Sequence, residues 1–123
     1  MEKSKDHHTI LLWTICVITV VVSLPRFSLA HKLSVFAWVE GDTVFVQGTL
    51  GGGKRPKRGV VSVYDGKDAL LLRTEVKADG TASFPLRDWE TGLKIIMDIG
   101  EGHQSYWILT PYDIKSQSGE VKE

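Results

Sequence analysis

Seven short segments with strand-like alternation, separated by turn signals, constrain the fold of this chain more than any other feature. They lie between Leu33 and Thr110, at a spacing of roughly 8 to 12 residues, and Asp-Gly pairs at 65–66 and 79–80 mark two of the turns. No segment among them has the 3.6-residue periodicity of an amphipathic helix. The pattern predicts an all-β fold, a small antiparallel seven-stranded β-sandwich, and excludes a parallel α/β enzyme.

The first of these segments, Leu33–Val39, carries bulky side chains on both faces. Its odd-numbered residues are apolar, and Phe36 and Trp38 lie on the opposite face. Because a strand that is apolar on both faces is typical of a position inside a sheet, we expect this strand to be central. We expect Trp38, Trp89 and Trp107 to pack in the core or at the sandwich edge, and not to form a platform for stacking a ligand.

The amino-terminal part of the chain differs from the rest. A polar start is followed by the apolar run Ile10–Leu24, of 15 residues. This length suits the core of a signal peptide and is shorter than the roughly 20 residues of a membrane-spanning helix. Ser28 and Ala30 supply the small residues that signal peptidase requires, which predicts cleavage between Ala30 and His31.

Residues 1–30 are therefore expected to form a hydrophobic signal helix that is removed. The alternative is an uncleaved anchor in which residues 10–24 tether the protein to the membrane. In both cases the following domain faces the outside of the cytoplasmic membrane, either periplasmic or on its outer surface. We expect residues 31–112 to form the β-sandwich domain and residues 113–123 to form a polar carboxyl-terminal tail.

Charge and cysteine content exclude several functions. The chain has 15 basic and 15 acidic residues, so no basic field favours a nucleic acid partner. Its single cysteine, Cys16, lies in the apolar run, which leaves the domain without a disulfide or thiol chemistry. No serine stands in a nucleophile motif, and we therefore expect a protein that is not an enzyme.

His31 is a candidate metal ligand because of the predicted cleavage. If it becomes the first residue, its α-amine and its imidazole Nδ1 can close one chelate ring on a divalent ion. Both groups titrate near neutral pH, so protons compete only modestly with the metal. Nitrogen donors in a flat arrangement suit Ni²⁺ or Cu²⁺. The alternative is that His31 is simply the first residue of the domain, with no ligand role.

His103 is the second histidine of the predicted domain, in the stretch "DIGEGHQS". Gly100 and Gly102 permit a tight turn between two strands, which leaves the imidazole on an open loop. The oxygen donors Asp98 and Glu101 are possible secondary metal contacts. An ordinary surface turn with no ligand role is the alternative for all three side chains.

The stretches "AHKLSVFAWVEGDTVFVQGTL" and "GLKIIMDIGEGHQSYWIL" resemble one known family. It is the NikL/CbiL-type extracytoplasmic accessory subunit of nickel and cobalt energy-coupling-factor (ECF) ABC transporters. The resemblance covers roughly residues 30 to 109 and is carried by the Ala-His junction and the G-x-G-H loop. The segment between them is similar to carboxypeptidase regulatory-like modules, which have a transthyretin-like (prealbumin) sandwich.

The resemblance implies a module that binds Ni²⁺ or Co²⁺ outside the membrane and hands the ion to the membrane subunits of the transporter. It assigns metal contact to His31 and His103. Many members continue into a carboxyl-terminal membrane helix, whereas this sequence ends in hydrophilic residues. Membrane association is therefore expected through residues 10–24 or through the transporter subunits.

Two other functions fit the sequence. The first is a cell-envelope β-sandwich interaction module that binds no metal. The second is a copper-binding periplasmic protein, because an amino-terminal histidine paired with a second histidine also suits copper.

Overall fold

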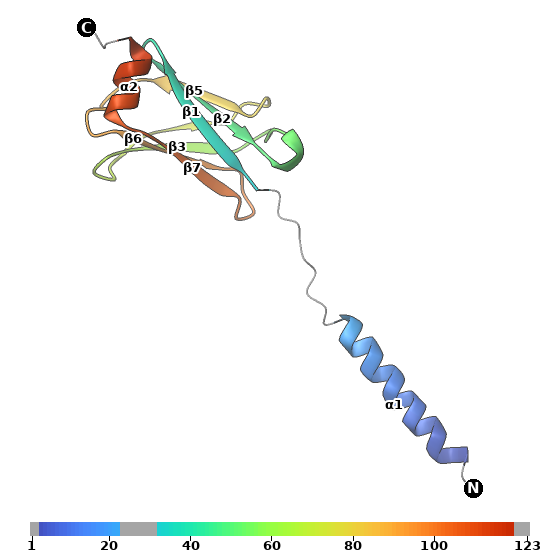
Figure 1. Ribbon diagram of the computed structural model, residues 1–123. Coiled ribbons are helices and arrows are strands. Elements are labelled where there is room, and N and C mark those ends of the chain that lie inside the picture. Colours follow the sequence, from blue (N-terminus) through green and yellow to red (C-terminus); the bar gives the residue numbers. More distant parts are fainter. Residues whose placement is uncertain (1–2, 23–31, 120–123) are drawn as a thin grey trace. The chain divides into compact units, whose positions relative to one another are not determined.

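The computed structural model describes residues 3–22 and 32–119 (Figure 1). The chain divides into two compact units, Met1–Ala30 and His31–Glu123. In the first unit, helix α1 spans Lys3–Val22. Its described apolar side chains, such as Ile10 and Trp13, are exposed. Among the described residues, no helix combines the length and the hydropathy needed to span a membrane. Whether α1 is a signal helix stays a prediction.

The second unit contains the seven predicted strands, all paired in antiparallel fashion. They form two sheets, with strand orders β1-β2-β5 and β4-β3-β6-β7. The strands are β1 (Ser34–Glu40), β2 (Thr43–Thr49), β3 (Val60–Asp65), β4 (Leu70–Glu75), β5 (Thr81–Pro85), β6 (Leu93–Asp98) and β7 (Gln104–Leu109). A short 3₁₀ helix, η1 (Gly51–Gly53), follows β2, and helix α2 (Pro111–Ser118) follows β7.

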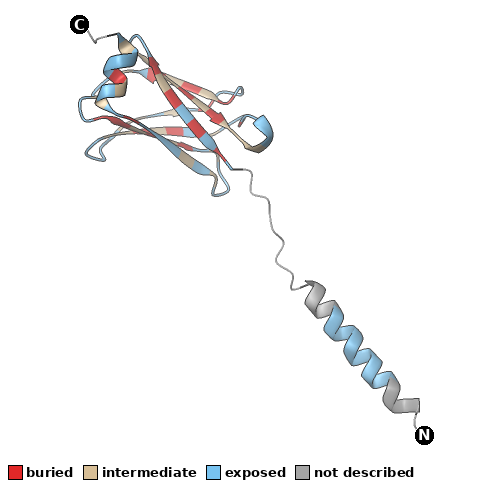
Figure 2. Cartoon of the chain, in the orientation of Figure 1, coloured by how far each residue is buried: buried red, intermediate tan, exposed pale blue. Residues whose placement is uncertain are grey.

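A single apolar core lies between the two sheets (Figure 2). Buried and exposed residues alternate along the strands, as the period-2 pattern predicts. The buried apolar residues are Leu33, Val35, Ala37, Val39, Val44, Val46, Val61, Val63, Val76, Ala82, Phe84, Leu93, Ile95, Met97, Leu109 and Ile114. All of them belong to the second unit, so the β domain has a complete core without α1. The arrangement is consistent with the predicted β-sandwich.

The Asp-Gly turns form where the sequence predicts them. Asp65 Oδ1 accepts hydrogen bonds from the backbone N–H groups of Lys67, at 2.8 Å, and Ala69, at 2.9 Å. Asp79 Oδ1 accepts from the Thr81 hydroxyl at 2.6 Å and from its backbone N–H at 3.1 Å. These side chains satisfy backbone donors in the turn at Lys67 and Ala69 and at Thr81, the first residue of β5, which is why aspartate favours such turns.

Two predictions about the second unit are wrong. Strand β1 is an edge strand of its sheet and not a central one, with β2 as its hydrogen-bonded neighbour. Its second apolar face does not require a central position, since Phe36 and Trp38 contact other aromatic rings on the outer face of the sheet. Residues 113–123 are not simply a polar tail. Residues as far as Ser118 belong to α2, which packs against β1 and β7 and buries Ile114 completely.

Candidate functional site

The turn between β6 and β7 carries His103. The backbone N–H of Ile99 donates to the carbonyl oxygen of His103 at 3.0 Å, and the N–H of His103 donates to that of Gly100 at 2.9 Å. Gly100, Glu101 and Gly102 all have positive φ angles, of 89°, 55° and 79°. Glycine adopts such angles without strain, which explains the G-x-G spacing before the histidine.

The three side chains near this turn have different surroundings. Asp98 Oδ1 accepts a hydrogen bond from the Gly100 N–H at 2.8 Å, so this carboxylate helps to hold the turn. Glu101 is exposed at the tip, and His103 is half-buried. The His103 imidazole has no partner among the described residues. Metal binding by Asp98 Oδ1 would compete with its role in the turn.

The start of β1 lies at the same end of the domain as this turn. Strands β1 and β7 lie side by side and run in the same direction (Figure 1). Their side chains are in register, since the Phe36 ring contacts the Trp107 ring. Leu33 precedes Phe36 by three residues in the sequence, and His103 precedes Trp107 by four residues. The first described residues of the domain, Lys32 and Leu33, therefore lie at the end that carries the His103 turn.

His31 and Ala30, the predicted metal ligand and the residue before the predicted cleavage site, lie outside the described residues. Within residues 3–22 and 32–119, no group of three or more His, Cys, Asp and Glu side chains is placed to hold a metal ion. The described residues bring His103, Asp98 and Glu101 to one turn. A site that uses His103 would need ligands beyond the described residues, and His31 directly precedes the first described residue of the domain in the sequence.

Positive charge also gathers at this end, in the loop after β2. Lys54, Arg55, Lys57 and Arg58 are exposed, and Arg55 reaches the Asp79 carbonyl oxygen at 3.5 Å. The Thr81 hydroxyl, which donates to the Asp79 carboxylate, lowers the pKa of Asp79. These cations stand at the same end as the carboxylates of Asp79, Asp98 and Glu101, so charges of both signs surround this end of the domain.

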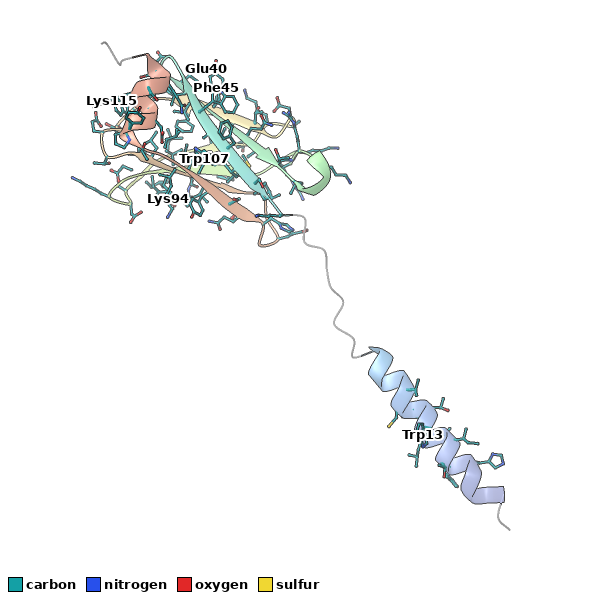
Figure 3. All side chains as sticks on the ribbon, viewed as in Figure 1. Trp13, Glu40, Phe45, Lys94, Trp107 and Lys115 are labelled. Carbon is teal, nitrogen blue, oxygen red and sulfur yellow. The ribbon has the colours of Figure 1, made fainter. Side chains whose placement is uncertain are left out.

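A row of aromatic rings on the outer face of sheet β1-β2-β5 was not expected from the sequence. Phe36 stacks on Trp38 with ring centroids 5.5 Å apart, and Trp38 stacks on Phe45 at 5.7 Å. Trp107 of β7 meets Phe36 edge to face at 5.0 Å, and Figure 3 shows Trp107 beside β1. Phe36 is 50% exposed and Trp107 is 37% exposed.

The prediction for the tryptophans holds for two of the three. Trp89 packs against the core and Trp107 packs at the sandwich edge between β1 and β7, whereas Trp38 lies on the outer face of its sheet. The signal for the row is present in the sequence. Phe36 and Trp38 are two residues apart and so share a face, and the tight turn after Glu40 places Trp38 opposite Phe45.

Comparisons of the chain with family models, curated proteins and solved structures found no match.

Proposed function

We propose that the protein is an extracytoplasmic accessory module of a nickel or cobalt uptake transporter, which binds the divalent ion through a mature amino-terminal His31. The observation that supports the proposal is the position of His103 at the end of the domain where β1 begins. His31 directly precedes Lys32, the first described residue at that end, and stands 72 positions before His103 in the sequence. The proposed sandwich is of the transthyretin-like type, and its proposed partners are the membrane subunits of an ECF transporter.

The chemistry of the proposed site follows from its donors. Cleavage after Ala30 gives His31 a free α-amine beside its imidazole, and these two groups close a chelate ring. His103 supplies a third nitrogen, while Asp98 and Glu101 offer secondary contacts. Three nitrogen donors leave open positions on Ni²⁺ or Co²⁺ for water. Such an open site suits transfer of the ion to another protein better than permanent storage.

A titration of the mature domain tests the proposal. The protein that begins at His31 is titrated with Ni²⁺, Co²⁺ and Cu²⁺ by calorimetry, next to a matched protein whose His31 α-amine is acetylated. Acetylation converts the amine into an amide and removes one donor without adding another amine. The proposal predicts that nickel binding weakens by about tenfold or more, equivalent to about 1.4 kcal/mol. Equal nickel affinity of the two proteins would contradict the proposal.

A second variant tests the contribution of the turn. His103→Gln removes the imidazole and keeps a polar side chain of similar reach. Lower affinity for Ni²⁺ in this variant supports a shared site. His7 and His8 cannot act as competing ligands in this experiment, because the mature protein begins at His31. Unchanged affinity would leave His31 as the only ligand and would remove His103 from the proposal.

The outer aromatic row favours a second candidate function, an interaction module of the cell envelope that needs no metal. Exposed aromatic side chains that contact one another are enriched at protein surfaces that bind partners. The titration separates the candidates, because the interaction module predicts no binding of any of the three ions at micromolar concentration. A copper-binding protein would bind Cu²⁺ while failing to bind Ni²⁺ and Co²⁺ at that concentration.

A further inference from the structure

A groove opens on the outer surface where β1, β2 and β7 meet, beside the first residues of the domain. Its volume is about 300 Å³, at the lower end of the range for small-molecule pockets. Six of the described residues line it, from two sheets: Ser34, Val35, Phe36, Gln47, Thr49 and Trp107. His103, Asp98 and Glu101 are not among them, so the groove is a different feature from the His103 turn.

Two aromatic rings form one part of this groove. The Phe36 and Trp107 rings meet at an interplanar angle of 77°, which leaves part of each ring open, with 50% of Phe36 and 37% of Trp107 exposed. Phe36 is held from behind by stacking on Trp38 at an interplanar angle of 21°. The rings are therefore fixed in place before any ligand arrives, which lowers the entropy cost of binding.

The other part of the groove is polar and carries no charge. Ser34 is paired with Thr49 across β1 and β2, and Phe36 is paired with Gln47. Within the described part of the chain, the side chains of Ser34, Gln47 and Thr49 make no hydrogen bond. Two hydroxyl groups and one amide thus offer both donors and acceptors to a ligand. Of the residues that the structure describes, no lysine, arginine, aspartate or glutamate lines the groove.

From these observations we infer that the groove is a binding site for a neutral saccharide. A sugar ring has one face of C–H groups, which packs on the negative face of an aromatic ring, and a rim of closely spaced hydroxyl groups. Phe36 and Trp107 provide the aromatic surface, and Ser34, Gln47 and Thr49 provide uncharged partners for the hydroxyl groups. A phosphate, a carboxylate or a metal ion would find no charged partner among the groove side chains.

This inference does not rest on the proposed transport function. None of the six described lining residues is a ligand of the proposed metal site, so either proposal can fail without the other. Experiments on the groove are carried out with EDTA present, which removes metal binding from the result.

The test is a ¹⁵N NMR titration of the mature domain with separate neutral oligosaccharides. The probes are chitotetraose, cellotetraose, laminaritetraose and maltotetraose, with a proline-rich decapeptide and tetragalacturonate as the other arms. We expect at least one neutral oligosaccharide to bind with a Kd below about 1 mM. Its saturable shifts should centre on Ser34, Thr49, the Gln47 side-chain amide and the Trp107 indole N–H.

Variants locate the site. Trp107→Ala should weaken binding of that oligosaccharide by about tenfold or more. Gln47→Leu, which keeps the size of the side chain, should weaken it by about two- to tenfold. Tyr112→Ala is the matched control, because Tyr112 is 77% exposed on α2 and does not line the groove. Thermal unfolding of each variant confirms that it is folded.

Three results would overturn the inference. The first is no saturable shift with any neutral probe at about 10 mM. The second is binding by the peptide or the acidic oligosaccharide alone. The third is a neutral probe whose affinity is the same for Gln47→Leu, Trp107→Ala and the Tyr112→Ala control.

Discussion

The Phe36 ring of one sheet meets the Trp107 ring of the other sheet edge to face, with centroids 5.0 Å apart. Strands β1 and β7 lie side by side without being hydrogen-bonded neighbours in either sheet. The aromatic pair therefore connects the two sheets at an edge where strand pairing does not. The same contact sets the alignment of β1 with β7, and that alignment brings the His103 turn to the start of β1.

A double-mutant cycle measures this contact. We expect Phe36→Ala and Trp107→Ala to be non-additive in the free energy of unfolding. Edge-to-face pairs contribute about 0.5–1.5 kcal/mol beyond the area that they bury, so the coupling energy should fall in that range. Urea denaturation of the wild type, both single variants and the double variant gives the value. A coupling energy near zero would show that the contact between the two rings does not contribute to the free energy of unfolding.

Helix α2 is expected to be an essential part of the folded domain. Ile114→Ala removes a side chain that is 0% exposed and leaves a cavity against β1 and β7. Substitutions of this kind lower the free energy of unfolding by about 2–5 kcal/mol. Tyr112→Ala, in the same helix but 77% exposed, should change it by less than about 0.5 kcal/mol. Equal stability of the two variants in urea denaturation would contradict the packing of α2.

The cap of α2 should make part of the stability depend on pH. The hydroxyl of Thr110, the residue before the helix, donates to the Asp113 carboxylate at 2.7 Å and accepts from the Asp113 N–H at 3.1 Å. The donated bond lowers the pKa of Asp113 below its usual value of 3.8. The ionised carboxylate therefore stabilises the fold fully above that value, and the stabilisation is lost as the pH falls through the lower pKa of the folded state.

Asp113→Asn isolates this contribution. At neutral pH the variant should be less stable than the wild type by about 1 kcal/mol or less, because it loses the charge at the helix amino terminus. At about pH 2 the two proteins should have nearly the same free energy of unfolding. Urea denaturation at both pH values makes the comparison. A difference that is independent of pH would show that the charge of Asp113 has no effect.

Strand β1 has an exposed edge that α2 partly covers. The backbone N–H of Val39 donates to Gln117 Oε1 of α2 at 2.8 Å. Gln117→Leu should leave this donor without a partner and increase the hydrogen-exchange rate of the Val39 amide by about tenfold. Gln117→Glu keeps an acceptor oxygen and is the control. Similar exchange rates of the Val39 amide in the two variants would contradict this role of Gln117, because they would show that the amide is equally protected without the Gln117 acceptor.

The sequence predicted the strands and turns well, because those features depend on local patterns. Alternation along Ser34–Glu40 identified β1, and the aspartates at 65 and 79 identified turns through bonds to nearby backbone groups. The position of β1 at a sheet edge could not be predicted in this way. It depends on which strands become neighbours, and alternation within one strand does not specify its neighbours.

The carboxyl-terminal helix was missed for a related reason. Its sequence is polar except for a few residues, and one isoleucine does not make a periodic pattern. The local signals were nevertheless present, since Thr110 and Asp113 form a capping box and Pro111 is the first residue of the helix. The outer aromatic row likewise required the pairing of Trp38 with Phe45, which single-strand patterns do not contain.

The central claim is that one divalent ion is held at the end of the domain where β1 begins and where the His103 turn lies. Paramagnetic NMR with one equivalent of Co²⁺, added to the mature domain that begins at His31, tests this claim most directly. The account predicts that the amide signals of Lys32 and of Gly100–Gln104 broaden together, while those of α2 remain. Broadening confined to one of the two segments, or no broadening at all, would contradict it.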